Sequence, residues 1–203
     1  MRLSKLTKKG VSVALALSMV VAGTAGMTQK ASAAKKFKTY VMFADDKWKV
    51  TANMNTAKGE YDSPKTIKAK KGTQNVSMTL TKSKLKTGAK EKTSTASVFC
   101  VDIENAMKTY KPNQIKISKV KIFVDGKAIK VKANKLKQGY LEKDQKNNKF
   151  RLEIFNVYGK GGTGAKKANY PVDPNKLKFK KSLKVSFKLT FKKYLRVIFK
   201  KIL

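Results

Sequence analysis

The feature that most constrains this fold is a strict alternation of apolar and polar residues over 182–191. Its apolar positions are Leu183, Val185, Phe187, Leu189 and Phe191, and lysine, serine and threonine lie between them. A period of two places the apolar side chains on one face of a strand, which predicts a half-solvated antiparallel strand. The segments 76–80 and 150–155 alternate in the same way.

Turn-rich stretches separate several further strands. We predict strands at 37–43, 65–70, 75–81, 96–103, 115–124, 127–132, 149–156 and 182–191. Asp125-Gly126 predicts a hairpin, a slip of the apolar phase predicts a β-bulge near Ser118, and a short helix is expected at 104–110. About eight short strands indicate an all-β fold, an antiparallel and jelly-roll-like β-sandwich over 34–191.

Residues 1–33 have the pattern of a secretory signal peptide. A basic start is followed by an apolar stretch, 11–27, that is shorter than the roughly 20 residues of a membrane span. Ala31-Ser32-Ala33 then matches the A-x-A cleavage pattern. We therefore expect a secreted, extracellular protein that begins near Ala34, with an uncleaved anchor as the alternative.

The chain has a large excess of lysine. Lys+Arg is 48 against 12 Asp+Glu, with no histidine, and the formal net charge of +36 falls to +31 without the signal. Outward strand positions accommodate part of it, because lysine reaches water while its stem covers apolar surface. Solubility requires a net charge of only about 2–8, so we expect that either the working environment or a bound polyanion screens the surplus. Export and the scarcity of arginine argue against specific nucleic-acid binding.

Catalysis is not expected from this composition. Without histidine, no Ser-His or Cys-His nucleophile and no His-based zinc site can form. A pair of carboxylates could still serve a glycosidase, and Glu142 with Glu153, or Asp102 with Glu104, are the candidate pairs. We predict no catalytic residues, metal site or cofactor, and leave a structural calcium bound by Asp45, Asp46 or Asp102 as an open alternative.

Two polar residues are expected inside the sandwich. Cys100 lies in a predicted buried strand, so a buried structural thiol is expected. Arg151 is the only arginine between the signal and the tail, and its planar guanidinium should pair with Glu153, Glu142 or Asp102. A ligand contact is the alternative for Arg151.

Six segments, taken in order, resemble a known family. They are 40–48 (YVMFADDKW), 98–103, 122–127, 150–159 (FRLEIFNVYG), 171–174 and 183–189. This combination resembles a module of secreted proteins from gut and rumen clostridia (Lachnospiraceae and relatives), which also occurs attached to glycoside hydrolases. The resemblance implies a jelly-roll-like sandwich similar to carbohydrate-binding modules, without catalysis. The chain departs from that family in its basic charge and in having only Trp48 where members often carry several aromatic residues.

Loop aromatics predict a carbohydrate site. An exposed tryptophan stacks on the apolar face of a pyranose ring, while carboxylates and amides bind its hydroxyls. The candidate residues are Asp45, Asp46, Trp48, Asn53, Tyr61, Tyr158 and Tyr170. The alternative is that Trp48 covers the end of the core.

Two cationic segments are candidate anion sites. The stretch 159–164 matches G-x-G-x-x-G, but the prolines in 170–174 block the helix that a dinucleotide site requires. A mobile cationic loop is expected instead. Its ammonium and backbone N–H groups could hold an anion, and plain flexibility is the alternative. As a helix, the tail 192–203 would separate apolar and basic faces and suit an acidic membrane surface, and a strand is the alternative. The candidate residues are Lys160, Lys166, Lys167, Lys192, Lys193, Arg196 and Lys200.

Two functions therefore remain open. One is a secreted, non-catalytic module that binds carbohydrate at the cell surface or on plant or host polysaccharide. The other is a cationic cell-envelope protein held by teichoic acid, acidic polysaccharide or acidic lipid. Binding that weakens steeply with added salt would favour the second.

Overall fold

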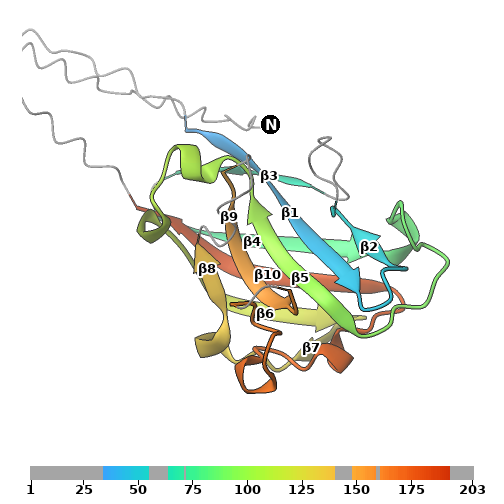
Figure 1. Ribbon diagram of the computed structural model, residues 1–203. Helices are drawn as coiled ribbons and strands as arrows, with labels where there is room; N and C mark the ends of the chain where they lie inside the picture. Colours follow the sequence, from blue (N-terminus) through green and yellow to red (C-terminus); the bar gives the residue numbers. More distant parts are fainter. Residues whose placement is uncertain (1–33, 55–63, 71, 140–147, 159–160, 193–203) are drawn as a thin grey trace, which may run out of the picture. The chain divides into compact units, whose positions relative to one another are not determined.

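The computed structural model describes residues 34–54, 64–70, 72–139, 148–158 and 161–192 (Figure 1). These residues form two antiparallel sheets that pack together, which confirms the predicted β-sandwich. The strands are β1 (Lys36–Asp45), β2 (Thr51–Ala52), β3 (Lys65–Lys68), β4 (Gly72–Thr81), β5 (Ala96–Ile103), β6 (Ile115–Val124), β7 (Lys127–Ile129), β8 (Lys137–Gly139), β9 (Phe150–Asn156) and β10 (Ser182–Phe191).

The four-stranded sheet has the order β4-β10-β6-β7. Its strand β10 has the predicted alternation, with the apolar residues buried and the polar residues between them facing outward. Asp125 and Gly126 both have positive φ, 49° and 85°, and form the expected two-residue turn between β6 and β7. The predicted bulge is also present, since the register of β6 against β10 shifts between Ser118 and Lys121.

The six-stranded sheet has the order β2-β1-β5-β9-β8, with β3 paired to the other end of β1. In Figure 1, β1 and β5 of this sheet lie in front of β4 and β10 of the other. The central strand β5 is buried along its whole length. Its inner side chains, such as Phe99 and Val101, join the core between the sheets, whereas Val98 and Cys100 pack with Met42 on the outer face.

Three details differ from the sequence-based expectations. The predicted helix at 104–110 is wrong: this stretch holds a short 3-10 turn, Ala106–Lys108, preceded by Asn105 in the left-handed region at φ 57°. Strands β2 and β8 were not predicted, because two or three residues are too few to show a period-two pattern. Strand β7 ends at Ile129, and the N–H of Lys132 instead bonds the carbonyl of Pro171.

The predicted signal, 1–33, and most of the basic tail, 193–203, lie outside the described residues. Strand β10 ends at Phe191, and the N–H of Lys192 still donates to the carbonyl of Gln114. Within the described ranges, we find no helix with the length and apolar character needed to cross a bilayer.

Candidate functional site

A buried carboxylate organises the loop after β1. Asp45 is fully buried at the end of the strand, and its Oδ1 accepts hydrogen bonds from the backbone N–H groups of Lys49 (2.9 Å) and Val50 (3.2 Å). Its Oδ2 accepts from the N–H of Ser94 at 3.2 Å. These bonds hold the chain in a tight turn in which the N–H of Trp48 donates to the carbonyl of Asp45.

Trp48 lies at the strained position of this turn. Its φ of 55° is in the left-handed region, where a bulky residue costs about 1–2 kcal/mol relative to an ordinary conformation. The side chain is nevertheless 46% exposed. The alternative role for Trp48, covering the end of the core, is therefore wrong, and the turn instead presents the indole to solvent.

The indole is paired with a second exposed aromatic ring. Its Nε1–H donates a 2.8 Å hydrogen bond to the hydroxyl of Tyr158, which is 47% exposed, and the ring centroids lie 5.8 Å apart. Tyr158 follows β9, and its own N–H donates to the side chain of Asn156. Two loops that are 110 residues apart in the sequence thus build one exposed aromatic surface, which we call the Trp48–Tyr158 pair.

The other predicted carbohydrate residues take different positions. Asp46 is exposed two residues before Trp48, and its carboxylate accepts from the hydroxyl of Ser94. Asp45 and Asn53 are corrections to the predicted site. Both are buried: Asp45 serves the turn described above, and the Asn53 amide donates to the carbonyl of Val41. Tyr61 lies outside the described residues.

Tyr170 belongs to a separate pocket of about 470 Å³, within the range of small-ligand sites. Its ring packs edge-on against Phe155. The pocket lining comprises Ile129, Lys130, Lys132, Lys167, Tyr170, Pro171, Val172, Asp173, Pro174, Asn175 and Lys176. The pocket brings together Tyr170, a predicted carbohydrate-binding residue, and Lys167, a predicted anion-binding residue. The other lysines were not predicted, because nothing in their local sequence distinguishes them.

The glycine-rich loop after β9 was expected to be flexible, but hydrogen bonds hold its residues Thr163 and Gly164 in place. Thr163 is buried and its N–H donates to Glu153 at 2.6 Å, while the N–H of Gly164 donates to the carbonyl of Asn156 at 2.8 Å. A Cβ on Gly162 would lie 2.4 Å from that same carbonyl oxygen, so only glycine fits there. The expectation that this loop offers its N–H groups to an anion is therefore wrong for these two groups.

The other predicted anion-binding residues fall into two groups, those that the structure describes and those that lie outside the described residues. Lys166, Lys167 and Lys192 are exposed, so their ammonium groups face water. Lys160, Lys193, Arg196 and Lys200 lie outside the described residues, and so does the choice between helix and strand for the tail.

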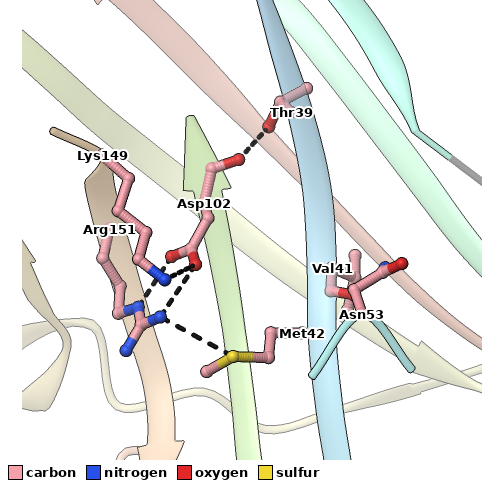
Figure 2. A network of polar contacts seen from close by, with 7 residues as sticks. All are labelled: Thr39, Val41, Met42, Asn53, Asp102, Lys149 and Arg151. Carbon is pink, nitrogen blue, oxygen red and sulfur yellow. Dashed lines mark hydrogen bonds and ion pairs between the residues drawn. The ribbon is translucent and has the colours of Figure 1, made fainter. Parts of the chain in front are cut away.

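A buried ion-pair network lies on the six-stranded sheet (Figure 2). Arg151 binds Asp102 through two hydrogen bonds, from Nε to Oδ1 at 2.7 Å and from Nη2 to Oδ2 at 2.8 Å. Lys149 adds a 3.1 Å contact to Oδ2. Burial by itself raises the pKa of Asp102, but Arg151 and Lys149 outweigh it and hold this pKa below its usual value. Of the three predicted partners of Arg151, Asp102 is thus confirmed, in a structural role.

Cys100 is buried as expected, and burial raises the pKa of its thiol well above its ordinary range. In the described part of the chain, acidic and cysteine side chains do not gather in groups of three that could hold a metal ion. Asp45 and Asp102, two of the carboxylates considered for calcium, bind backbone N–H groups and cations of the protein instead.

Comparison of the chain with protein-family models, with curated proteins and with solved structures finds no match. The resemblance to the clostridial module stays a prediction.

Proposed function

We propose that this protein is a secreted, non-catalytic module that binds a saccharide at the Trp48–Tyr158 pair. The observation that carries the proposal is that the only tryptophan of the chain is held outward on a strained backbone and hydrogen-bonded to an exposed tyrosine. Strain of this kind persists only where the surrounding structure enforces it, and it gathers at functional sites. An indole needed only for packing would not require it.

The chemistry of the pair suits a sugar ring. The exposed indole offers an apolar face to the C–H groups of a pyranose. The Tyr158 hydroxyl already accepts from the indole Nε1, so its own proton remains for donation to a sugar hydroxyl. The exposed carboxylate of Asp46 can accept hydrogen bonds from further hydroxyls.

A panel of neutral and acidic glycans, measured at low and high salt, tests this function. Because stacking and hydrogen bonds between neutral groups are not screened, binding should persist at high salt. Trp48→Ala and Tyr158→Ala should each weaken binding by about fivefold or more, since by analogy with stacked bases loss of a stacking ring costs about 1–3 kcal/mol. Tyr158→Phe, which keeps the ring, should weaken it less.

The control for this experiment is Val157→Ala. Val157 is an exposed apolar side chain directly before Tyr158, so its truncation removes surface without removing a ring. Its affinity should equal that of the unmodified protein. Absence of binding to every glycan, or undiminished binding by Trp48→Ala, would contradict the proposal.

The second function, retention on an anionic polymer of the cell envelope, is favoured by the charge of the chain. The net charge of +36, or +31 without the predicted signal, exceeds what solubility requires, and it stores self-repulsion that bound anions relieve. Charge would supply retention and a fast association rate, while the aromatic pair supplies selectivity. The two functions are compatible in one protein.

A further inference from the structure

The outer face of the four-stranded sheet carries a basic hollow that is separate from the Trp48–Tyr158 pair. Its volume is about 330 Å³. The lining consists of Lys65, Asn75, Val76, Ser77, Lys119, Lys121, Ser186, Phe187 and Lys188. Four ammonium groups, two hydroxyls and an amide thus surround one depression, and its lining holds no acidic residue. We call this hollow the basic groove.

Strand register explains why these side chains meet. Phe187 pairs with Val76, so Ser186 lies opposite Ser77 on β4, while its partner on β6 is Lys121. Lys188 follows two residues along β10 and pairs with Ser118. Hydroxyls therefore occupy the floor of the groove, and lysines flank them. Neighbouring strands lie about 4.8 Å apart, and alternate residues of one strand about 6.8 Å apart.

The β-bulge places a further lysine in the groove. Lys119 has a φ of 52°, in the left-handed region, and lies where the register of β6 against β10 shifts. A bulge redirects a side chain at the cost of regular pairing, and bulges are frequent next to binding sites. At the far end, the ammonium of Lys65 reaches from β3 to the carbonyl of Ser77 at 3.3 Å.

The lysines of the groove are not neutralised within the described structure. Lys119, Lys121 and Lys188 form no ion pair with a described carboxylate. Asp125, the carboxylate at the turn between β6 and β7 of the same sheet, instead accepts from the N–H groups of Lys180, Lys181 and Ser182. Ammonium groups gathered around one depression repel each other, so this arrangement favours a bound counter-charge.

We propose that the basic groove binds a linear anionic polymer that carries one oxyanion per repeat, either a phosphodiester or a carboxylate. Ammonium groups attract such an oxyanion as point charges, and the hydroxyls of Ser77 and Ser186 can donate hydrogen bonds to it. The groove is open to solvent and its four lysines come from β3, β6 and β10, so it suits successive groups of a chain better than one small ion. This site is independent of the saccharide function proposed above, and it rests on the second function, retention on an anionic polymer, for which it supplies the binding surface.

Binding of the full-length chain to poly(glycerol phosphate), to polygalacturonate and to a neutral glucan at several salt concentrations tests the site. The groove variant is Lys119→Gln/Lys121→Gln/Lys188→Gln. The matched control is Lys84→Gln/Lys108→Gln/Lys178→Gln, which removes three exposed lysines outside the groove and leaves the same net charge. A further variant, Ser186→Glu, introduces one negative charge on the floor of the groove and guards against a folding defect of the triple variant.

The groove variant should bind the anionic polymers at least tenfold more weakly at low salt. Its slope of log affinity against log salt should be smaller by about 2–3, since each ammonium that binds an oxyanion releases roughly one counterion. The control should lose less than threefold, Ser186→Glu should lose at least tenfold, and Trp48→Ala should bind the polyanions unchanged. Preference for one polymer identifies the oxyanion. Equal losses in groove and control variants, or no binding of either polyanion by the unmodified chain, would overturn the proposal.

Discussion

At the scale of single residues, the exposure and backbone conformation of Trp48 argue against a role in packing the core. A tryptophan that caps a core costs about 3–5 kcal/mol when it is truncated. Here the side chain is half exposed, and its backbone is in the left-handed region, which glycine adopts without strain.

We therefore predict that Trp48→Gly changes the free energy of unfolding by no more than about 1–2 kcal/mol. Relief of the backbone, worth about 1 kcal/mol, offsets removal of the indole from Tyr158, which costs about 0.5–1.5 kcal/mol. Trp48→Ala lacks that relief and should be less stable than Trp48→Gly by about 1 kcal/mol. Chemical denaturation of the three proteins measures these differences. A Gly variant less stable than the Ala variant would contradict the backbone argument.

The ion pair of Asp102 predicts a dependence of stability on pH. The folded-state pKa of Asp102 lies below the value of about 3.9 for an unfolded aspartate. Its contribution to stability is therefore fully present above about pH 4 and is lost as the pH falls through the folded pKa. The stability gap between the unmodified protein and Asp102→Asn should be constant from about pH 5 to 7 and should shrink below about pH 4. Urea denaturation across this range measures the gap, and a gap independent of pH would contradict the prediction.

At the scale of elements, the β6–β7 turn is tied to the start of β10. The carboxylate of Asp125 accepts hydrogen bonds from the N–H groups of Lys180 (2.9 Å), Lys181 (2.7 Å) and Ser182 (2.9 Å). The turn residue thus also holds the strand that pairs with both β4 and β6. Asp125 therefore has a role beyond its positive φ, and the two contributions can be separated by substitution.

Asp125→Ala should destabilise the protein more than Asp125→Asn. Asparagine tolerates the left-handed region and keeps one carbonyl oxygen as an acceptor, whereas alanine loses every bond and adds strain. We expect about 2–3 kcal/mol for alanine and about half of that for asparagine, measured by thermal or urea denaturation. Gly126→Ala is the control for strain alone, because a Cβ there meets no atom within 4 Å. Equal effects of Ala and Asn at Asp125 would exclude the bridging role.

Strands could be predicted where one face meets water. The alternation in β10 correctly predicted its bounds as 182–191, and the phase slip within β6 located the bulge, because a one-residue insertion reverses the facing of every later side chain. The segment 96–103 was correctly predicted as a buried strand, but the residues that cover its outer face, such as Met42, could not be foreseen. A local sequence does not encode which distant residues will cover that face.

The candidate sites could be predicted only in part, for the same reason. Trp48 and Tyr158 are separated by 110 residues, and nothing in either segment indicates that the indole donates to the tyrosine hydroxyl. Asp45 and Asp46 are adjacent and chemically identical, yet one is buried and the other exposed. Their roles depend on which of the two side chains points into the protein. Asp45 does so because three backbone N–H groups, brought together only in the folded chain, donate to its carboxylate.

At the scale of the whole molecule, the charge of the chain predicts a response to salt. The net charge of +36, or +31 without the predicted signal, repels itself in the compact state, and added ions shorten the range of that repulsion to about 8 Å at physiological ionic strength. The melting temperature should therefore rise as sodium chloride increases from about 10 to 150 mM, and a soluble polyanion should raise it further. Scanning calorimetry at constant pH measures both effects. A melting temperature that does not change with salt would indicate that the lysines are already too widely spaced to repel.

The pairing of the only tryptophan with Tyr158 gives the protein an internal optical reporter. Every photon absorbed by indole in this chain reports on the side chain proposed to stack on a sugar. A ligand that covers this half-exposed ring removes water from it and should shift its emission toward the blue, whereas occupation of the basic groove should leave the spectrum unchanged. Fluorescence titration of the unlabelled protein can therefore assign each bound molecule to one of the two surfaces.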